Sequence, residues 1–425
     1  MKKMNRAAAK KDSLLRHACS HILWGAGTAL VLFALLMMSY SLPNEKIRSH
    51  IKDASEILSL EGSYPAFYFY DTSIVADNYT DSLILSVAYA KGENPSLLEN
   101  VLANPYYNSG SNDPAKDLKR LAGTDVSPNI NYSRYWFGTS GAMRFLLTFF
   151  DLVSIRFFLI AAVFFSLAAA MLSASKVIGT KNAAILGAAL FFTRIFNVAF
   201  CMQFAPVFII SSLSVTAVCA AKQYGCFEKA LPRILIMNGV FTAFFDLLTC
   251  PLLAFGLPAA AAMIIHLKAE DKKPQKGDLF FFLVKCGLFW FISYAGMYLI
   301  KWGISSAVLS ENSVEIALKS LHARMSSGGE YTSVQAIRQN LENYFGFSEI
   351  TILVVITAAW IIWQTAVRKK TLSEQFPLRR LPLCLVAVSP LLWYAILPNH
   401  SCIHHWMTYR SLAVTFYAYL SWLLC

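Results

Sequence analysis

The sequence predicts an all-α, polytopic membrane protein with about ten transmembrane helices. Its 425 residues are 56% hydrophobic and only 15% charged, whereas about a quarter of the residues are charged in a typical soluble protein. Apolar runs of about 18 or more residues recur along the chain, and such a run is long enough for a helix to cross a bilayer. We expect residues 1–425 to form a single transmembrane domain.

The first predicted span covers residues 22–41 and follows a segment, 1–21, that carries six basic residues. A cleaved signal peptide is the alternative, but the apolar run is long for one and no small-residue cleavage site follows it. We therefore expect an uncleaved anchor whose N-terminal tail lies in the cytoplasm. Nine further spans are expected at 153–174, 182–199, 204–221, 234–249, 251–267, 279–302, 347–366, 381–398 and 411–425. The last has only 15 residues, roughly 22 Å of helix against a hydrocarbon core of roughly 30 Å, so either this helix starts earlier or the chain is truncated at Cys425.

The distribution of charge agrees with this topology. The five segments expected in the cytoplasm hold 20 Lys and Arg against 6 Asp and Glu, and the rest of the chain holds 17 against 19. Basic residues concentrate in the cytoplasmic segments of membrane proteins, so the net charge of +12 indicates topology and not a nucleic-acid partner. We expect a multi-pass protein of the bacterial plasma membrane. Its outside segments are a large loop with juxtamembrane helices at 42–152, a second loop at 304–346 and a short link at 399–410.

Missing motifs exclude several classes of function. No glycine-rich phosphate loop lies between a strand and a helix, so a dinucleotide-binding or P-loop enzyme is not expected. The nine cysteines lie mostly inside apolar segments and form no C-x-x-C pair, which indicates buried thiols and not a disulfide framework or a zinc site. No cofactor is predicted, and a divalent metal is left open.

Three carboxylates of the first loop, Asp71, Asp77 and Asp81, fall within eleven residues. The apolar positions after Asp81 suit one face of a helix, for which we predict Thr80 as the N-cap. Asp81 then lies in the first turn, where the helix dipole favours an anion, and this structural role is the alternative to a chemical one. A carboxylate held at the membrane surface is suited to act as a general base. Asp77 has no expected capping role, which favours it as the chemical residue.

Two arginines, Arg134 and Arg144, lie near the end of the first loop. Arg134 precedes a run of aromatic residues and Arg144 lies in an apolar stretch, 142–151, a pattern that predicts a helix in the membrane interface. An aromatic belt alone accounts for this pattern. The alternative is that the two guanidinium groups bind a lipid phosphate, because guanidinium pairs well with phosphate oxygens.

Asp246 is predicted at the outer end of the fifth span. A carboxylate at membrane depth is costly, so it indicates a functional site. The alternative is an interfacial carboxylate that ends a helix just before Pro251.

The link 399–410 contains three histidines, among them His400 and His404, followed by Tyr409 and Arg410. A helix places His400 and His404 on one face, but a zinc site needs at least a third ligand. We expect these side chains instead to hydrogen-bond a phosphate or a sugar, or to tie the link to its neighbours.

These features together resemble the GT-C class of integral-membrane glycosyltransferases. The shared features are a cytoplasmic N-terminus, one span, a large outside loop with carboxylates and juxtamembrane helices, and many further spans. More narrowly, the chain resembles a group of bacterial multi-pass membrane proteins. The stretches that carry this narrower resemblance are Asp77–Asp81, Arg134–Gly138, Phe245–Pro251 and Asn399–Arg410.

The resemblance implies that the donor is a polyprenyl-phosphate sugar and that an acidic residue of the first loop is the base. That role falls on Asp77 or Asp81. GT-C enzymes usually place this carboxylate within a few residues of the first span, whereas about 35 residues intervene here, so Asp71 remains a candidate.

We therefore expect an enzyme that transfers a sugar from a lipid-phosphate donor to an extracytoplasmic acceptor, with membrane lipid as its other partner. One alternative is a transporter or flippase of a polar or lipid-linked substrate. It requires charged residues along a pore, and its candidates Lys285, Lys301 and Arg194 can all be placed near span ends, where long side chains reach the interface. The other alternative is a non-catalytic membrane scaffold.

Overall fold

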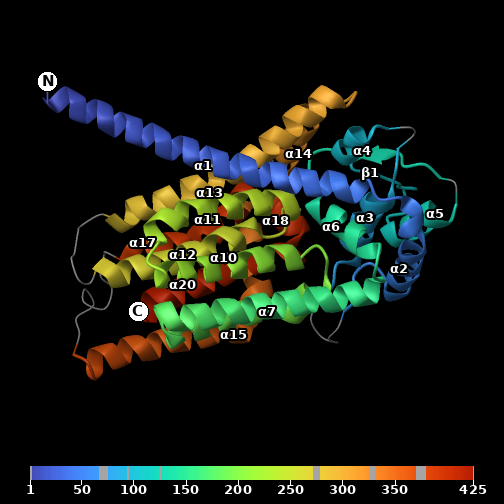
Figure 1. Cartoon of the computed structure of the whole chain (residues 1–425). Helices are drawn as coiled ribbons and strands as arrows, with labels where there is room; N and C mark the ends of the chain where they lie inside the picture. The colour runs from blue at the N-terminus through green and yellow to red at the C-terminus, as the bar shows by residue number, and fades with distance from the viewer. Residues whose placement is uncertain are drawn as a thin grey trace.

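The computed structural model describes residues 2–66, 75–92, 95–124, 126–270, 278–325, 331–369 and 380–424. Most of these residues belong to helices (Figure 1). Within this part of the chain the one sheet is a short antiparallel pair, β1 (Pro105–Tyr106) and β2 (Ile130–Asn131). The predicted all-α class is therefore confirmed. Asp71 lies outside the described residues.

Five helices are long and apolar enough to cross a membrane. They are residues Cys19–Tyr40 of α1 (Lys2–Tyr40), α7 (Leu152–Ile178), α10 (Ala205–Gln223), α12 (Pro251–Glu270) and α13 (Asp278–Val308). Each coincides with a predicted span. Large apolar side chains such as Phe165 and Leu172 of α7 are 76% and 64% exposed, and a soluble monomer rarely shows such surfaces over whole helices. These helices support a multi-pass helical membrane protein.

The other five predicted spans correspond to helices that are shorter, broken or more polar. They are α8 (Thr180–Phe191) with α9 (Ile195–Phe200), α11 (Phe227–Phe245), α15 (Ser333–Ala366), α17 (Leu381–Ile396) and α20 (Leu412–Leu424). An unbroken helix over 182–199 was predicted, and this is wrong. Arg194 between α8 and α9 has a left-handed backbone, with φ of 60°, which ends the helix even though the hydropathy continues. Gly346 breaks α15 in the same way, with φ of 52°, one residue before the predicted eighth span.

The first loop folds into a small helical region at one end of the bundle (Figure 1). Its elements are η1 (Asn44–Lys46), α2 (Arg48–Glu61), α3 (Asn78–Tyr89), α4 (Leu97–Ala103), α5 (Pro114–Gly123) and α6 (Gly138–Leu147). They share a hydrophobic core with the adjoining ends of α1, α11 and α13, built from residues such as Leu36, Ile51, Leu85 and Trp136. The helix expected from 142 is α6, which begins four residues earlier, at Gly138, where the chain packs closely on Phe244.

Helix α12 lies at the centre of the bundle. Its apolar window is 78% buried, against 17% for that of α1, so most of the apolar surface of α1 lies on the outside of the bundle. The remaining short elements are α14 (Ser313–Met325), α18 (Pro398–Ile403), α19 (His405–Thr408) and η3 (Tyr409–Ser411). Because α14 packs on α18 and α4 packs on α13, the second loop and the 399–410 link lie at the same end of the bundle as the first loop.

Candidate functional site

Asp77 lies immediately before α3 and is 1% exposed. Its Oδ1 accepts a hydrogen bond from the backbone N–H of Thr80 at 2.9 Å, and its Oδ2 accepts one from the Thr80 hydroxyl at 3.0 Å. Asp77 is thus the N-cap, and the prediction that Thr80 has this role is wrong. The reason is that an aspartate side chain satisfies the free N–H groups of a first turn at least as well as a threonine does. Any chemical role of Asp77 therefore has to rest on its other neighbours.

Those neighbours are three aromatic rings and a cation. Tyr64 and Tyr79 stack at 6.1 Å between ring centroids with an interplanar angle of 4°, and Tyr64 meets the ring of Trp406 edge-on at 5.4 Å. Burial raises the pKa of Asp77, while the hydrogen bonds from Thr80, the nearby Trp406 side chain and the charge of Arg410 act in the opposite direction. Asp77 is thus a buried carboxylate beside part-exposed rings and a guanidinium group.

Arg410 is fully buried at the start of the last helix. Its Nε donates to the carbonyl of Thr193 at 3.2 Å and its Nη1 to the carbonyl of Trp406 at 2.6 Å. The Tyr409 hydroxyl donates to the same Thr193 carbonyl at 3.1 Å. These bonds hold the link against the break between α8 and α9. The Nη2 of Arg410 is buried with no hydrogen-bond partner, so the N–H groups on this edge of the guanidinium are left to donate.

Asp81 is in the first turn of α3, as predicted, and is fully buried. Its Oδ2 accepts from the backbone N–H of Met202 and its Oδ1 from that of Gln203, each at 3.1 Å. Burial raises the pKa of Asp81 to about 7, although the Met202 bond and the charge of Arg156 act in the opposite direction. Both oxygens are used to fasten α3 to the segment before α10, which gives Asp81 a structural role.

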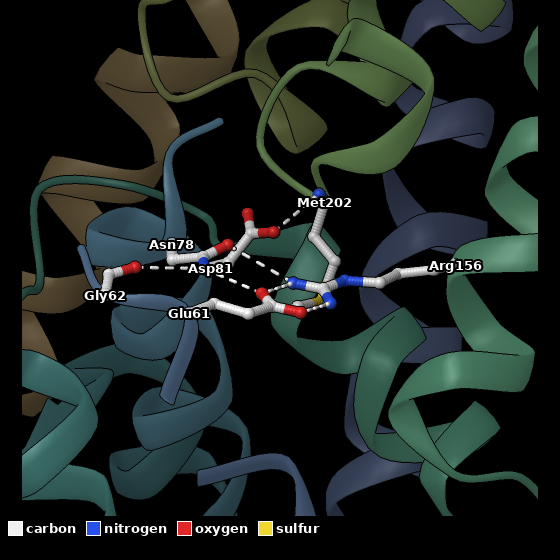
Figure 2. A network of polar contacts seen from close by, with 6 residues as sticks. All are labelled: Glu61, Gly62, Asn78, Asp81, Arg156 and Met202. Carbon is white, nitrogen blue, oxygen red and sulfur yellow. Dashed lines mark hydrogen bonds and ion pairs between the residues drawn. The ribbon is translucent and has the colours of Figure 1, made fainter. Parts of the chain in front are cut away.

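An ion pair beside Asp81 joins the first loop to α7 (Figure 2). Arg156 binds Glu61 through both terminal nitrogens, at 2.7 and 2.8 Å, and donates to the side-chain oxygen of Asn78 at 3.2 Å. Asn78 in turn donates to Glu61 and to the Gly62 carbonyl. A bidentate pair of this kind fixes orientation as well as distance. It holds the start of α3, and therefore Asp77, in position.

A second group of polar side chains surrounds Asp246, in the turn between α11 and α12. Its Oδ1 accepts from the backbone N–H and the hydroxyl of Thr249, whereas its buried Oδ2 has no hydrogen-bond partner. His400 bonds the Leu248 carbonyl through Nε2 at 2.9 Å, so Nε2 carries the proton and the buried, unpartnered Nδ1 is an acceptor. Asp246 and His400 thus each have one buried atom in this second group that lacks a hydrogen-bond partner.

Burial lowers the pKa of His400 to about 3 and that of His404 to about 4, so both rings are neutral at neutral pH. The ring of His404 lies 5.0 Å from that of His400 and 5.3 Å from that of Trp406. The two histidines therefore connect the Asp246 group to the aromatic rings beside Asp77. That Asp77, Asp246 and Arg410 surround one cavity remains a prediction.

The two predicted phosphate-binding arginines have different surroundings. Arg144 is 3% exposed and donates to the backbone carbonyls of Ser39, Leu42 and Ala88, so its guanidinium group ties α1, α3 and α6 together. We leave Arg144 out of the site for this reason. The guanidinium of Arg134 lies 3.9 Å above the ring of Tyr132 and borders a cavity next to α13.

No group of three or more His, Cys, Asp or Glu side chains that fits a metal ion occurs in the described part of the chain. The chain matches no protein-family model, and no curated protein or solved structure is significantly similar to it. The site is therefore defined by its geometry alone.

Several residues of the site were not predicted from the sequence. Arg156 was treated as part of an apolar span, although a charged residue inside such a span is itself a signal of function or pairing. Tyr64 and Tyr79 are near Asp77 in the chain but carry no local signal of their own. Gln203 reaches Asp81, and Trp406 reaches Tyr64, only through the packing of segments more than 100 residues apart.

Proposed function

We propose that the chain is a membrane glycosyltransferase that moves a sugar from a polyprenyl-phosphate donor to an acceptor at the extracytoplasmic face, with Asp77 as the general base. The observation that carries the proposal is the environment of Asp77. A buried carboxylate with a raised pKa stands beside Arg410 and beside the part-exposed rings of Tyr64, Tyr79 and Trp406. A base works best when its pKa lies near the operating pH, and flat aromatic faces suit the apolar face of a sugar ring.

In the proposed reaction, Asp77 removes the proton from an acceptor hydroxyl as its oxygen attacks the anomeric carbon of the sugar. The bond between that carbon and the phosphate oxygen breaks, and the lipid phosphate leaves with the bonding electrons. Arginine side chains of the outer face compensate the charge on the leaving phosphate. The charge of Arg410 favours the ionised form of Asp77, which is the form that accepts the proton.

The same proposal includes a GT-C-like topology of ten spans in the bacterial plasma membrane, with the N-terminus in the cytoplasm. The charge distribution supports it, as do the five apolar helices and the gathering of both outside loops at one end of the bundle. Lys301, a candidate pore residue of the transporter alternative, donates to the carbonyl of Leu102 at 2.7 Å. It is therefore engaged with the first loop and not with a mid-membrane pore.

The Asp77→Asn variant tests the assignment of the base. Asparagine caps a helix about as well as aspartate, so the fold should persist, whereas loss of a positioned base costs roughly 10²–10⁴ in rate. We expect transfer of labelled sugar from a polyprenyl-phosphate donor, measured in membranes, to fall by that factor. Asp151→Asn is the matched control, because Asp151 caps α7 by accepting from the Ser154 N–H in the same way. This control should transfer normally.

Two outcomes contradict the proposal. If Asp77→Asn, Asp81→Asn and Asp71→Asn all retain near-normal transfer, none of the three is the base. If the unaltered protein transfers no sugar but moves a lipid-linked substrate across vesicles, the transporter alternative replaces the enzyme.

A further inference from the structure

A cavity of about 460 Å³ lies beside α13, between the Arg134–Tyr135 segment, α14 and the end of α17. Its wall is mostly aromatic and aliphatic, with Trp290, Tyr294 and Tyr298 on one side and Trp393 on another. Phe291 and Leu299 also line it and are 58% and 64% exposed. Because these two belong to the apolar surface of a candidate membrane span, the cavity is continuous with the lipid-facing surface of α13.

Two arginines, Arg134 and Arg324, are among the residues that line this cavity. Arg324 donates to the Tyr135 hydroxyl at 3.0 Å and to Ser320, while its Nε is buried without a partner. Arg134 is placed over Tyr132, and its side chain has no hydrogen bond to any residue in the described part of the chain. Neither arginine forms an ion pair with a described carboxylate.

Two part-exposed positive charges beside an apolar cavity favour a ligand that carries an anionic group. Guanidinium presents planar pairs of N–H donors that match phosphate oxygens, and the aromatic wall requires an apolar body. Asp246 forms no ion pair with either arginine, and its Oδ1 accepts from the Thr249 N–H. A ligand that carries both a phosphate and an apolar chain fits these two features together.

We propose that this cavity binds an amphiphile made of a phosphate head group and an apolar chain, with the phosphate between Arg134 and Arg324 and the chain along Phe291 and Leu299. The charge of Arg324 also acts on His400 and His404, whose rings lead to Trp406 and Asp77. The Arg324 end of the cavity is therefore the end close to these two histidines. Identifying the amphiphile with the sugar donor rests on the proposed function, whereas the binding itself does not.

The test separates head from chain by using three probes with the purified full chain: farnesyl phosphate, farnesol and inorganic phosphate. Equilibrium binding is measured by native mass spectrometry. We expect farnesyl phosphate to bind about tenfold or more tightly than either of the other two. Loss of a charge-assisted hydrogen bond to phosphate should weaken farnesyl phosphate binding about tenfold or more in Arg134→Gln and in Arg324→Gln. Arg338→Gln is the matched control, since Arg338 is exposed on α15 and paired with Glu342, and it should bind normally.

A second variant addresses the chain. Ala295→Phe places a ring inside the cavity and should weaken both farnesyl phosphate and farnesol, in protein that keeps the wild-type melting temperature. The inference is overturned if farnesol binds as tightly as farnesyl phosphate, if inorganic phosphate does, or if the arginine variants bind like the unaltered protein. Normal binding without any sugar transfer contradicts the proposed function and leaves this inference standing. If the unaltered protein transfers sugar and the arginine variants bind farnesyl phosphate normally, the proposed function stands and this inference is contradicted.

Discussion

Asp77 and Asp81 show how two like side chains, one helical turn apart, acquire different roles. Both are buried at the start of α3. The two oxygens of Asp81 are bound by the backbone N–H groups of Met202 and Gln203, whereas Asp77 caps its own helix and faces Arg410 and Trp406. The first-turn position of Asp81 was predictable because helix starts are local. Its partners were not, because they lie about 120 residues away in the chain.

The raised pKa of Asp81 makes a prediction about stability and pH. The folded protein holds this proton up to about pH 7, while an unfolded chain releases it near pH 4. Asp81 therefore contributes its full stability below pH 4, and that contribution is lost as pH rises to about 7. Between pH 5 and pH 8 the loss is roughly 2–3 kcal/mol. Asp81→Asn removes the titrating group, so the apparent melting temperature in detergent should fall less over this pH range than in the unaltered protein. An equal fall of the melting temperature in the variant and in the unaltered protein would contradict the raised pKa of Asp81.

At the scale of elements, the fold depends on close helix contacts made possible by small residues. A Cβ at Gly239 of α11 would lie 2.5 Å from the Trp290 carbonyl of α13 and would also overlap the Ser293 hydroxyl. Small residues allow such approaches between membrane helices. The apolar pattern predicted both helices, but it does not report which glycine faces a neighbour. Nor does it report the backbone break at Arg194, since hydropathy carries no information on φ.

Gly239→Ala should therefore push α13 away from α11 and displace Tyr294, which lines the cavity beside α13. Overpacking of this kind costs typically about 1–3 kcal/mol, so we expect a lower melting temperature. Gly296→Ala on α13 is the control, because no atom lies within 4 Å of its added Cβ and alanine favours a helix by roughly 1 kcal/mol over glycine. Equal melting temperatures for the two variants would contradict the described contact between α11 and α13.

At the scale of the molecule, the proposed function requires both loops to lie outside while the N-terminus lies inside. Composition predicted a helical membrane protein because recurring apolar runs of this length are typical of membrane-spanning helices. It did not predict how the loops converge, since the contacts of α14 with α18 and of α4 with α13 join distant segments. Charge asymmetry between the two sides is what the sequence offers for orientation.

Accessibility of single thiols to a membrane-impermeant maleimide in intact cells tests this central claim most directly. Lys119→Cys on α5 and Lys319→Cys on α14 each replace an exposed lysine whose ion pair lies at the surface, and such pairs contribute only about 0–1 kcal/mol. The native Cys226, exposed between α10 and α11, is the thiol expected inside. We predict labelling of both introduced thiols in intact cells, and of Cys226 only after the membrane is permeabilised. Labelling of Cys226 in intact cells, with both introduced thiols protected, would contradict the account.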